Sequence, residues 1–461
     1  MDNKIHFVVE LDLHSKTPLY IQLYDYIKKE IIAGNFKAGY KLPSIREGST
    51  LLNISKTTIE NTYNQLIVEG YIDNLPKKGY FINEITSYNY SKDFTVSKEG
   101  EIKHTITEQP FVNSGVDRDS FDTVLWKKLY NRVFNYELTN IYVNGQVEGE
   151  YELRREISEF VNNLRDGKTN PNQVIIGAGI QYLIGILIGI LGETHKTVAI
   201  EENGYNKAAY IFEDYNYNVD FLSTDSEDTF IGNLFKSEAK LLYVSPSHQY
   251  PYGQVMTITQ RMKLLNWANT VGGLIIEDDY DGIIRYDGKA ISCLQGLDNS
   301  DSVIYLGSFS KTLLPSLRIS YMIIPNKLID AYNKIKYKYT QSTSKIDQIV
   351  LSIFIGDGHM TRHLRKIRKI YKKKSTFIAN YLSSKYNQII NVINLSSGFH
   401  IIFEAKTNKA SDVIINLCKK NNIFIEVVKN SPCNMLLSLN YSGLPYNDIP
   451  NTMDTLVEIL K

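Results

Sequence analysis

One segment of the chain, from Ser308 to Arg318, restricts the possible folds more than any other. An apolar run at residues 303–307 predicts a buried strand, and it leads directly into Ser308, Ser310 and then Lys311. Arg318 follows the lysine by seven residues. A strand, a small hydroxyl-bearing turn, a lysine and a returning arginine are together typical of a site that holds an aldehyde cofactor covalently.

The chemistry of these side chains points to pyridoxal 5′-phosphate. A lysine amine forms an imine with the aldehyde of this cofactor once it is desolvated and deprotonated, and Lys311 is predicted to do so. The hydroxyls of Ser308 and Ser310 and the guanidinium of Arg318 suit its phosphate, because charge-assisted hydrogen bonds are strong. A surface lysine that merely follows a strand is the alternative for this segment alone.

A second segment, residues 274–281, predicts a buried strand that ends in carboxylates. Pyridoxal phosphate needs a carboxylate opposite its pyridine nitrogen, which keeps that nitrogen protonated and makes the ring electron-withdrawing. Asp278 is predicted to supply it, and Tyr280 to reach the 3′-oxygen of the ring. Asp279 and Asp281 are then expected to be ordinary acids at the end of the strand. A calcium site is the alternative, but no glycine-spaced loop of oxygen ligands follows, so we expect no metal.

A glycine-containing turn is a candidate phosphate site in its own right. Gly177 and Gly179 follow a β-branched run and precede an apolar helix expected over residues 182–191. Backbone N–H groups at the N-terminus of a helix bind anions, helped by the positive end of the helix dipole. Those of Gly179, Ile180 and Gln181 are the predicted donors. A tight strand-to-helix turn without a ligand is the alternative.

Together with other short pieces, these segments resemble the fold-type I pyridoxal phosphate enzymes, the aspartate aminotransferase superfamily. The pieces follow one another in the family's order, at residues 149–154, 174–183, 201–205, 245–253 and 398–400. The resemblance extends from about Phe111 to the C-terminus. It implies an α/β domain of the aminotransferase class I/II type, with Tyr205 placed over the cofactor ring.

The N-terminal part of the chain follows a different pattern. Apolar residues at helical spacing predict a first helix over residues 18–32, and Ser44 and Ser55 are good N-caps for a second and a third helix. Residues 71–75 and 79–82 predict a two-stranded wing. Three helices followed by a hairpin form a winged helix-turn-helix, which is an α+β fold. A small helical module for protein interaction is the alternative.

This stretch resembles the DNA-binding domain of the GntR family along its length. The resemblance implies binding to a double-stranded DNA operator, with the third helix in the major groove and the wing tip on the backbone or minor groove. The residues that it implicates are Ser44, Arg46, Ser55, Lys56, Thr57, Thr58, Lys77, Lys78 and Gly79. Lys56 stands where the family usually carries arginine, and lysine lacks the planar fork of that side chain.

Length and composition narrow the class of protein further. A chain of 461 residues is expected to hold two or more domains, here 1–83, a polar linker at 84–108, and 109–461. Its 3 cysteines show no paired CxxC spacing, which fits a reducing cytoplasm rather than a disulfide framework. Neither a membrane-spanning apolar stretch nor a signal peptide is evident, so we expect no membrane partner.

The order of winged helix, linker and aminotransferase-like domain resembles that of the MocR/GabR-type transcriptional regulators. The resemblance implies a homodimer whose second domain binds pyridoxal phosphate and senses a small-molecule effector. That effector is either the cofactor itself or an amine or amino acid, and binding shifts a conformational equilibrium. Sensing of the cofactor would suit control of vitamin B6 synthesis.

A catalytically active aminotransferase is the competing function. Such an enzyme needs a cation for the α-carboxylate of its substrate, whereas Ser438 and Lys207 stand where arginines are expected. Residues 250–253 also lack the asparagine that aminotransferases generally carry before the proline. These departures favour a sensor with little or no steady-state turnover.

Overall fold

The computed structural model describes residues 9, 11–84, 116–136, 138–202, 204–224, 226–250, 253–286, 288–394, 398–431 and 434–461. The chain divides into two compact units, Met1–Thr105 and Ile106–Lys461. Apart from Glu84, the predicted linker lies outside the described residues. No helix within the described ranges is long and apolar enough to cross a membrane.

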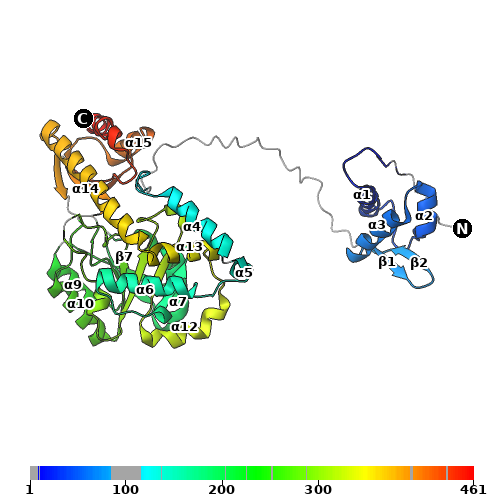
Figure 1. Ribbon diagram of the computed structural model, residues 1–461, viewed down its shortest axis with the longest axis horizontal. Helices are drawn as coiled ribbons and strands as arrows, with labels where there is room; N and C mark the ends of the chain where they lie inside the picture. The colour runs from blue at the N-terminus through cyan, green and yellow to red at the C-terminus, as the bar shows by residue number, and fades with distance from the viewer. Residues whose placement is uncertain are drawn as a thin grey trace. The chain divides into compact units, whose positions relative to one another are not determined.

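The first unit consists of three helices and a two-stranded wing (Figure 1). Its elements are α1 Leu19–Ile32, α2 Ile45–Leu52, α3 Lys56–Val68, β1 Ile72–Leu75 and β2 Gly79–Ile82. Ser44 forms a capping box with Glu47 at the start of α2, and the Ser55 hydroxyl accepts a hydrogen bond from the Thr58 backbone N–H at the start of α3. Both predicted N-caps and the antiparallel wing are therefore confirmed.

One apolar core fixes α3 against the rest of this unit. Leu23 and Ile27 of α1 and Leu66 of α3 are fully buried, as apolar side chains at helical spacing require. Tyr63, also on α3, donates a hydrogen bond from its hydroxyl to the Pro43 carbonyl at 2.9 Å. The start of α3 is thus held at a defined angle and remains accessible to a partner.

The second unit is built on a seven-stranded sheet in the order β3-β9-β8-β7-β6-β4-β5. The strand β9 is antiparallel to both of its neighbours, and the other neighbouring pairs are parallel. The strands are β3 Val174–Gly177, β4 Thr197–Glu201, β5 Asn218–Leu222, β6 Leu241–Val244, β7 Leu274–Asp279, β8 Val303–Ser308 and β9 Ser320–Ile323. Central strands read as nearly continuous apolar runs because helices cover both faces.

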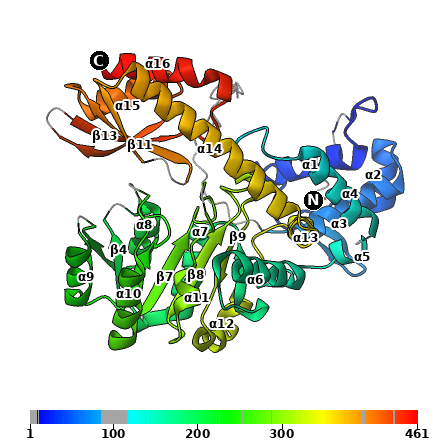
Figure 2. The ribbon, with the colours of Figure 1, turned by 60° about the vertical axis from the view of Figure 1, so that its left-hand side comes forward.

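The helices divide between those two faces (Figure 2). One face packs on α7 Ile180–Leu191, α8 Asn206–Asp214 and α12 Ile329–Ile335. The other packs on α6 Tyr151–Arg165, α9 Glu227–Lys236, α10 Ile258–Val271 and α11 Leu294–Leu297. Helix α7 begins two residues before the predicted start at residue 182, so the first turn includes Ile180 and Gln181.

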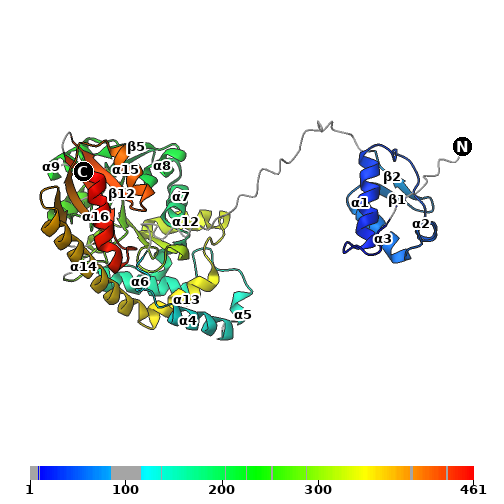
Figure 3. The ribbon, with the colours of Figure 1, turned by 90° about the horizontal axis from the view of Figure 1, so that it is seen from above.

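A smaller antiparallel sheet, in the order β10-β11-β13-β12, forms the C-terminal subdomain of this unit. Its strands are β10 Ile390–Asn394, β11 His400–Lys406, β12 Ile425–Asn430 and β13 Asn434–Asn440. The remaining helices are α4 Thr123–Tyr136, α5 Leu138–Ile141, α13 Lys345–Gly356, α14 His359–Lys385, α15 Ser411–Lys420 and α16 Ile449–Leu460. The long helix α14 contacts α13, β10 and α16, and it lies beside α16 (Figure 3).

Candidate functional site

Lys311 lies in the turn that follows β8, at the carboxyl end of the central strands. The parallel pairing of β7 with β8 sets Asp278 opposite Leu306, so the end of β7 reaches the same edge of the sheet. Burial lowers the pKa of the Lys311 amine against the opposing charges of Asp281 and Glu426, and the charge of Lys207 adds a smaller lowering effect. A lowered pKa leaves more of the amine in the neutral form that attacks an aldehyde.

Asp278 points to the face of the sheet that α7 and α8 cover, because side chains alternate along β7. The Tyr243 hydroxyl donates to its Oδ2 at 2.6 Å, while Oδ1 is buried without a hydrogen-bond partner. Desolvation raises the pKa of this carboxyl to about 7, although the Tyr243 hydrogen bond opposes the change. A buried carboxylate with a free oxygen is stabilised by a protonated ring nitrogen, so Asp278 fits the pyridine end of the cofactor.

The phosphate end of the candidate site is formed by Arg318 and the start of α7. Gly179 has a φ of 102°, and a Cβ at this position would lie 2.5 Å from Arg318 Nη2. Glycine therefore allows both the left-handed backbone and the close approach of the guanidinium. The Gly179 N–H donates to the Gly177 carbonyl, whereas Ile180 and Gln181 belong to the first helical turn, where N–H groups lack intrahelical acceptors.

The two serines of the lysine turn differ in their surroundings. The Ser308 hydroxyl accepts hydrogen bonds from the Ser320 hydroxyl at 2.9 Å and from the Ser310 backbone N–H at 3.2 Å. The Ser310 hydroxyl is buried and has no hydrogen-bond partner. Ser310 is thus suited to an anion placed beside Lys311, while Ser308 supports the turn itself.

Two tyrosines complete the set that the sequence predicts. Tyr205, just before α8, is 38% exposed, and its pKa is raised first by burial and then by the charge of Asp278, against the effect of Arg318. It therefore lies near both ends of the candidate site. Tyr280 donates its hydroxyl to the His248 carbonyl at 3.0 Å and stacks on the His248 ring. Its contact with the 3′-oxygen stays a prediction.

The expectation that Asp279 and Asp281 are ordinary strand-end acids is wrong. Both are buried, and Asp279 pairs with Arg165 of α6 at 2.9 Å, on the opposite face from Asp278. Asp281 pairs with His248 at 2.5 Å and raises the pKa of that imidazole against the effect of burial. Both carboxylates are paired because an unpaired charge is costly to bury.

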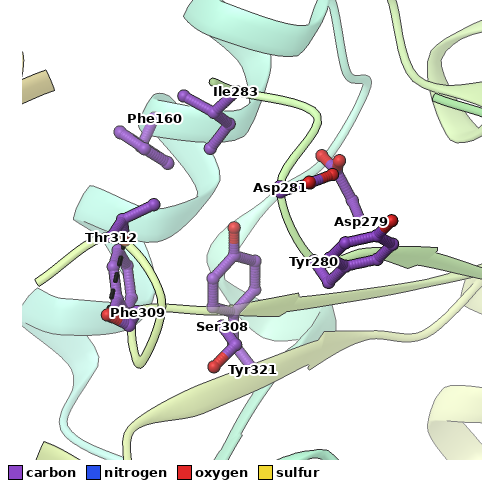
Figure 4. A pocket seen from close by; sticks show the side chains of 9 residues that line it. All are labelled: Phe160, Asp279, Tyr280, Asp281, Ile283, Ser308, Phe309, Thr312 and Tyr321. Atoms are coloured by element: carbon purple, nitrogen blue, oxygen red, sulfur yellow. Dashed lines mark hydrogen bonds between the residues drawn. The ribbon is translucent and has the colours of Figure 1, made fainter. Parts of the chain in front are cut away.

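A small cavity lies behind the lysine turn (Figure 4). Its lining includes Phe160 of α6, Asp279, Phe309 and Thr312, so it opens on the α6 side of the sheet. A volume of about 10 Å³ holds about one water molecule. The cavity is too small for a cofactor. In the described part of the chain, no group of three or more His, Cys, Asp or Glu side chains could hold a metal ion.

The residues present fit pyridoxal phosphate on three structural grounds. Asp278 has a free buried oxygen, Ser310 has a free buried hydroxyl, and Gly179 leaves the space that the Arg318 guanidinium occupies. When bound, the cofactor supplies an aldehyde that reacts with primary amines and a ring that withdraws electrons. The chain supplies the amine of Lys311, the counter-charge of Asp278 and the cation of Arg318.

The candidate DNA-binding face is exposed on the first unit. Arg46, Lys56 and Thr57 are exposed at the starts of α2 and α3, whereas the Ser44 and Ser55 hydroxyls are used in capping. Thr58 shares its hydroxyl with Ser55 at 2.8 Å. The wing turn carries exposed Lys77 and Lys78, and Lys77 has a φ of 64°.

Lys41 also lies at the wing, although no sequence motif predicts it there. The Lys41 side chain would lie 3.0 Å from a Cβ at Gly79, and the Lys41 amine lies over the Phe81 ring. The position precedes α2 and carries no local motif, so only the fold brings Lys41 to the wing.

A winged helix-turn-helix joined to a doubly wound sheet with this lysine site defines a DNA-binding regulator with a pyridoxal phosphate-binding domain of the aminotransferase type. The chain matches the family "Aminotransferase class I and II" over residues 127–452 and "Bacterial regulatory proteins, gntR family" over residues 19–82. It therefore belongs to the MocR-type transcriptional regulators, which combine these two domains. The predicted fold class and cofactor are confirmed.

Relatives that match most of the chain are described as regulatory proteins. The chain is 36% identical to the uncharacterized HTH-type transcriptional regulator YdeL of Bacillus subtilis, covering 94% of each chain. It is 29% identical to the probable rhizopine catabolism regulatory protein MocR of Rhizobium meliloti, over 80% of this chain and 78% of the relative. It is 26% identical to the pyridoxine biosynthesis regulator PdxR of Corynebacterium glutamicum, over 88% and 87%.

A solved structure shows the same fold in the second unit. An archaeal alanine:glyoxylate aminotransferase superposes with a TM-score of 0.66 at 21% identity, covering 75% of this chain and 89% of that one. The likeness establishes the fold of the second unit.

The raised pKa of Asp278 predicts a pH-dependent gain in stability on cofactor binding. The folded pKa of about 7 exceeds the unfolded value, so the cofactor-free protein loses stability as the pH rises from about 4 to 7, on the order of 4 kcal/mol. A protonated ring nitrogen beside the carboxylate offsets this loss. We expect pyridoxal phosphate to raise the melting temperature more at pH 8 than at pH 6.

The matched variant is Asp278→Asn, which keeps the shape of the side chain without the charge. Glu277, whose pKa burial also raises to about 7, titrates in both proteins and cancels in the comparison. Differential scanning fluorimetry at both pH values measures the effect. An equal pH-dependent gain in the variant would contradict the role of Asp278.

Proposed function

We propose that this regulator is a homodimer whose affinity for its DNA operator depends on pyridoxal phosphate or an amino compound bound at Lys311. One observation carries the proposal: Lys311, Asp278 and Arg318 share one edge of the sheet in a chain that also holds a winged helix. Ligand binding then shifts an equilibrium between two conformations that differ in DNA affinity.

The proposed roles follow the geometry of the site. Lys311 binds the cofactor covalently, Asp278 holds the ring nitrogen and Tyr205 covers the ring. The phosphate is held by Arg318 together with Ile180, Gln181 and Ser310. Gly179 leaves room for the guanidinium, and Ser308 supports the turn. Tyr280 serves the 3′-oxygen. The DNA contacts are those of Ser44, Arg46, Ser55, Lys56, Thr57, Thr58, Lys77, Lys78 and Gly79.

Helix α14 offers a path from the lysine turn to the start of the second unit. His363 hydrogen-bonds through its Nε2 to the Thr312 carbonyl at 2.6 Å, one residue after Lys311, and burial lowers the pKa of this imidazole. Farther along α14, Lys374 pairs with buried Asp117 at 2.6 Å. Asp117 follows the predicted linker closely, so a shift of α14 would reach the chain segment that leads to the DNA-binding unit.

Two kinds of effector remain compatible with this proposal. The description of PdxR names pyridoxine biosynthesis, which supports the cofactor itself as the signal and vitamin B6 synthesis as the regulated process. An amine or amino acid that reacts with the bound cofactor is the second kind. Both act through occupancy of the Lys311 site. The proposed operator binding implies that the protein works in the cytoplasm.

Exposed apolar side chains near α4 and α5 support the proposed homodimer. Val124, Tyr136 and Tyr142 are 80%, 82% and 80% exposed. Apolar side chains mark a protein interface where they form one contiguous exposed patch. Sedimentation velocity should give twice the chain mass of 52.8 kDa.

Substitutions on the DNA-binding face should weaken operator binding without affecting the cofactor. We expect Arg46→Ala and Lys56→Ala each to reduce affinity on the order of tenfold and to flatten the salt dependence, because each loses one contact with DNA. Fluorescence anisotropy on the DNA upstream of the gene measures affinity, and absorbance measures cofactor content.

The control is Lys29→Ala, an exposed lysine on α1 outside the predicted face. It should bind the operator as the unaltered protein does. A full-length protein that prefers no upstream fragment over random DNA would contradict the regulator function.

A further inference from the structure

The candidate ligand site has a second wall, formed by the small subdomain. Glu426 on β12 lies opposite Ser438 on β13, and Ser438 lies opposite Ile402 on β11. The hydroxyl of Tyr250, from the loop after β6, donates a hydrogen bond to Glu426 Oε2. The two subdomains therefore meet through a tyrosine and a carboxylate beside the Lys311 turn.

Glu426 belongs to a wall that contacts the carboxyl end of β7. The Tyr250 ring lies 6.3 Å from the His400 ring, and a Cβ at Gly398, just before β11, would lie 2.8 Å from Asp281 Oδ2. After Asp281, the Glu426 carboxylate is the second charge that raises the pKa of the Lys311 amine against the dominant effect of burial. The Glu426 side chain is exposed, so it keeps lone pairs available beyond the one that Tyr250 uses. A second group that approaches Lys311 from this wall would meet a negative charge.

The other polar groups of this wall are neutral. His400 on β11 is half-buried, and desolvation together with the nearby charge of Lys311 lowers its pKa to about 3. Ser438 is 2% exposed, and its hydroxyl lacks a hydrogen-bond partner of normal geometry although it lies close enough to lower the pKa of Tyr250. A ligand carboxylate placed against Glu426 would meet a like charge, whereas an ammonium group would find an acceptor carboxylate and the Ser438 hydroxyl.

We propose that the effector of this site is a primary amine that carries a second cationic group, such as a diamine, which pairs with Glu426. The inference rests on the proposed sensor function. One amine lies toward Lys311 and the cofactor, and the distal ammonium lies between Glu426 and Ser438. A charge-assisted hydrogen bond in this position favours the cation and disfavours an anion of the same length.

Three probes with the same chain length test the distal charge. They are 1,4-diaminobutane, butylamine and 4-aminobutanoate, which share a primary amine and differ in what the far end carries. Titration of the cofactor-loaded full-length protein, followed by its absorbance, gives the affinity without DNA. We expect 1,4-diaminobutane to bind on the order of tenfold more tightly than butylamine, and 4-aminobutanoate more weakly than both.

Two variants separate the charge of Glu426 from its contact with Tyr250. Glu426→Gln keeps an oxygen that accepts from Tyr250 and removes the charge, so the preference for the diamine should disappear. Tyr250→Phe removes the hydrogen bond and keeps the charge, so the preference should persist. Equal binding of the three probes, a preference for 4-aminobutanoate, or an unchanged preference in Glu426→Gln would each overturn the inference.

The same preparation distinguishes this inference from the proposed function. Operator affinity measured with and without pyridoxal phosphate tests the sensor function. Cofactor-dependent DNA binding with equal affinity for all three probes overturns the diamine effector and supports the sensor. A diamine preference with DNA binding that ignores every ligand supports the pocket and overturns the sensor.

Discussion

Lys311→Ala protein is expected to lose covalent attachment of pyridoxal phosphate completely. The unaltered protein should absorb near the boundary of the visible and ultraviolet ranges, and borohydride should fix the cofactor mass on the peptide that contains Lys311. The reason is the neutral amine that burial favours at this turn, with Asp278 and Arg318 placed for the two ends of the cofactor.

Lys207→Ala is the matched control, because Lys207 lies near enough to affect the pKa of Lys311 and is outside the predicted lysine turn. This variant should keep the reducible chromophore. Lys311→Ala protein that still shows the chromophore after dialysis and reduction would refute the assignment. Circular dichroism of both variants checks that loss of absorbance does not follow from loss of fold.

Steady-state transamination of glutamate, alanine and aspartate should be at least about a thousandfold slower than the usual enzyme rate of roughly 1 per second. A transaminase holds the α-carboxylate of each substrate with a cation. In this chain Ser438 and neutral His400 occupy the small-subdomain wall, and Glu426 adds a negative charge. The pocket should therefore hold these amino acids poorly, and a sensor does not need turnover.

Keto acid release, measured by a coupled assay on the preparation used for DNA binding, tests this expectation. A characterised aminotransferase assayed in parallel shows that the assay detects turnover. Rates near 1 per second together with DNA binding that is indifferent to cofactor occupancy would make the protein an enzyme instead.

Much of the fold was predictable because its signals are local. The capping serines Ser44 and Ser55, the wing and the strands before Asp278 and Lys311 each follow from a few neighbouring residues. The predicted start of α7 at residue 182 is two residues too late. The residue before Ile180 is Gly179, which has no side chain to cap the helix. Helix ends that lack a capping side chain carry no local sequence signal, and their boundaries vary by one or two residues.

Site residues were predictable only where the side chain and the motif that indicates its role lie in the same short segment. The pairing of Asp279 was not predictable because its partner Arg165 lies 114 positions earlier. The two meet only because side chains alternate along β7, so that Asp279 points toward α6. Glu426 was missed for a similar reason. Glu426 lies in a short strand of apolar and polar residues. Tyr250, which donates a hydrogen bond to it, lies 176 positions earlier in the chain.

The residues proposed to select the ligand and those proposed to transmit the signal lie on different elements, the strand pair β12–β13 and the helix α14. This division has a consequence for how the ligand specificity of such regulators can change. Residues that select a ligand, such as Glu426 and Ser438, project from the strands, whereas His363 and Lys374 connect the lysine turn to Asp117 through the helix. Exchanging the strand pair for that of a relative should therefore retarget the protein to another metabolite while the inherited output is kept. Inducible promoters of new specificity are obtainable in this way from a single DNA-binding unit and operator.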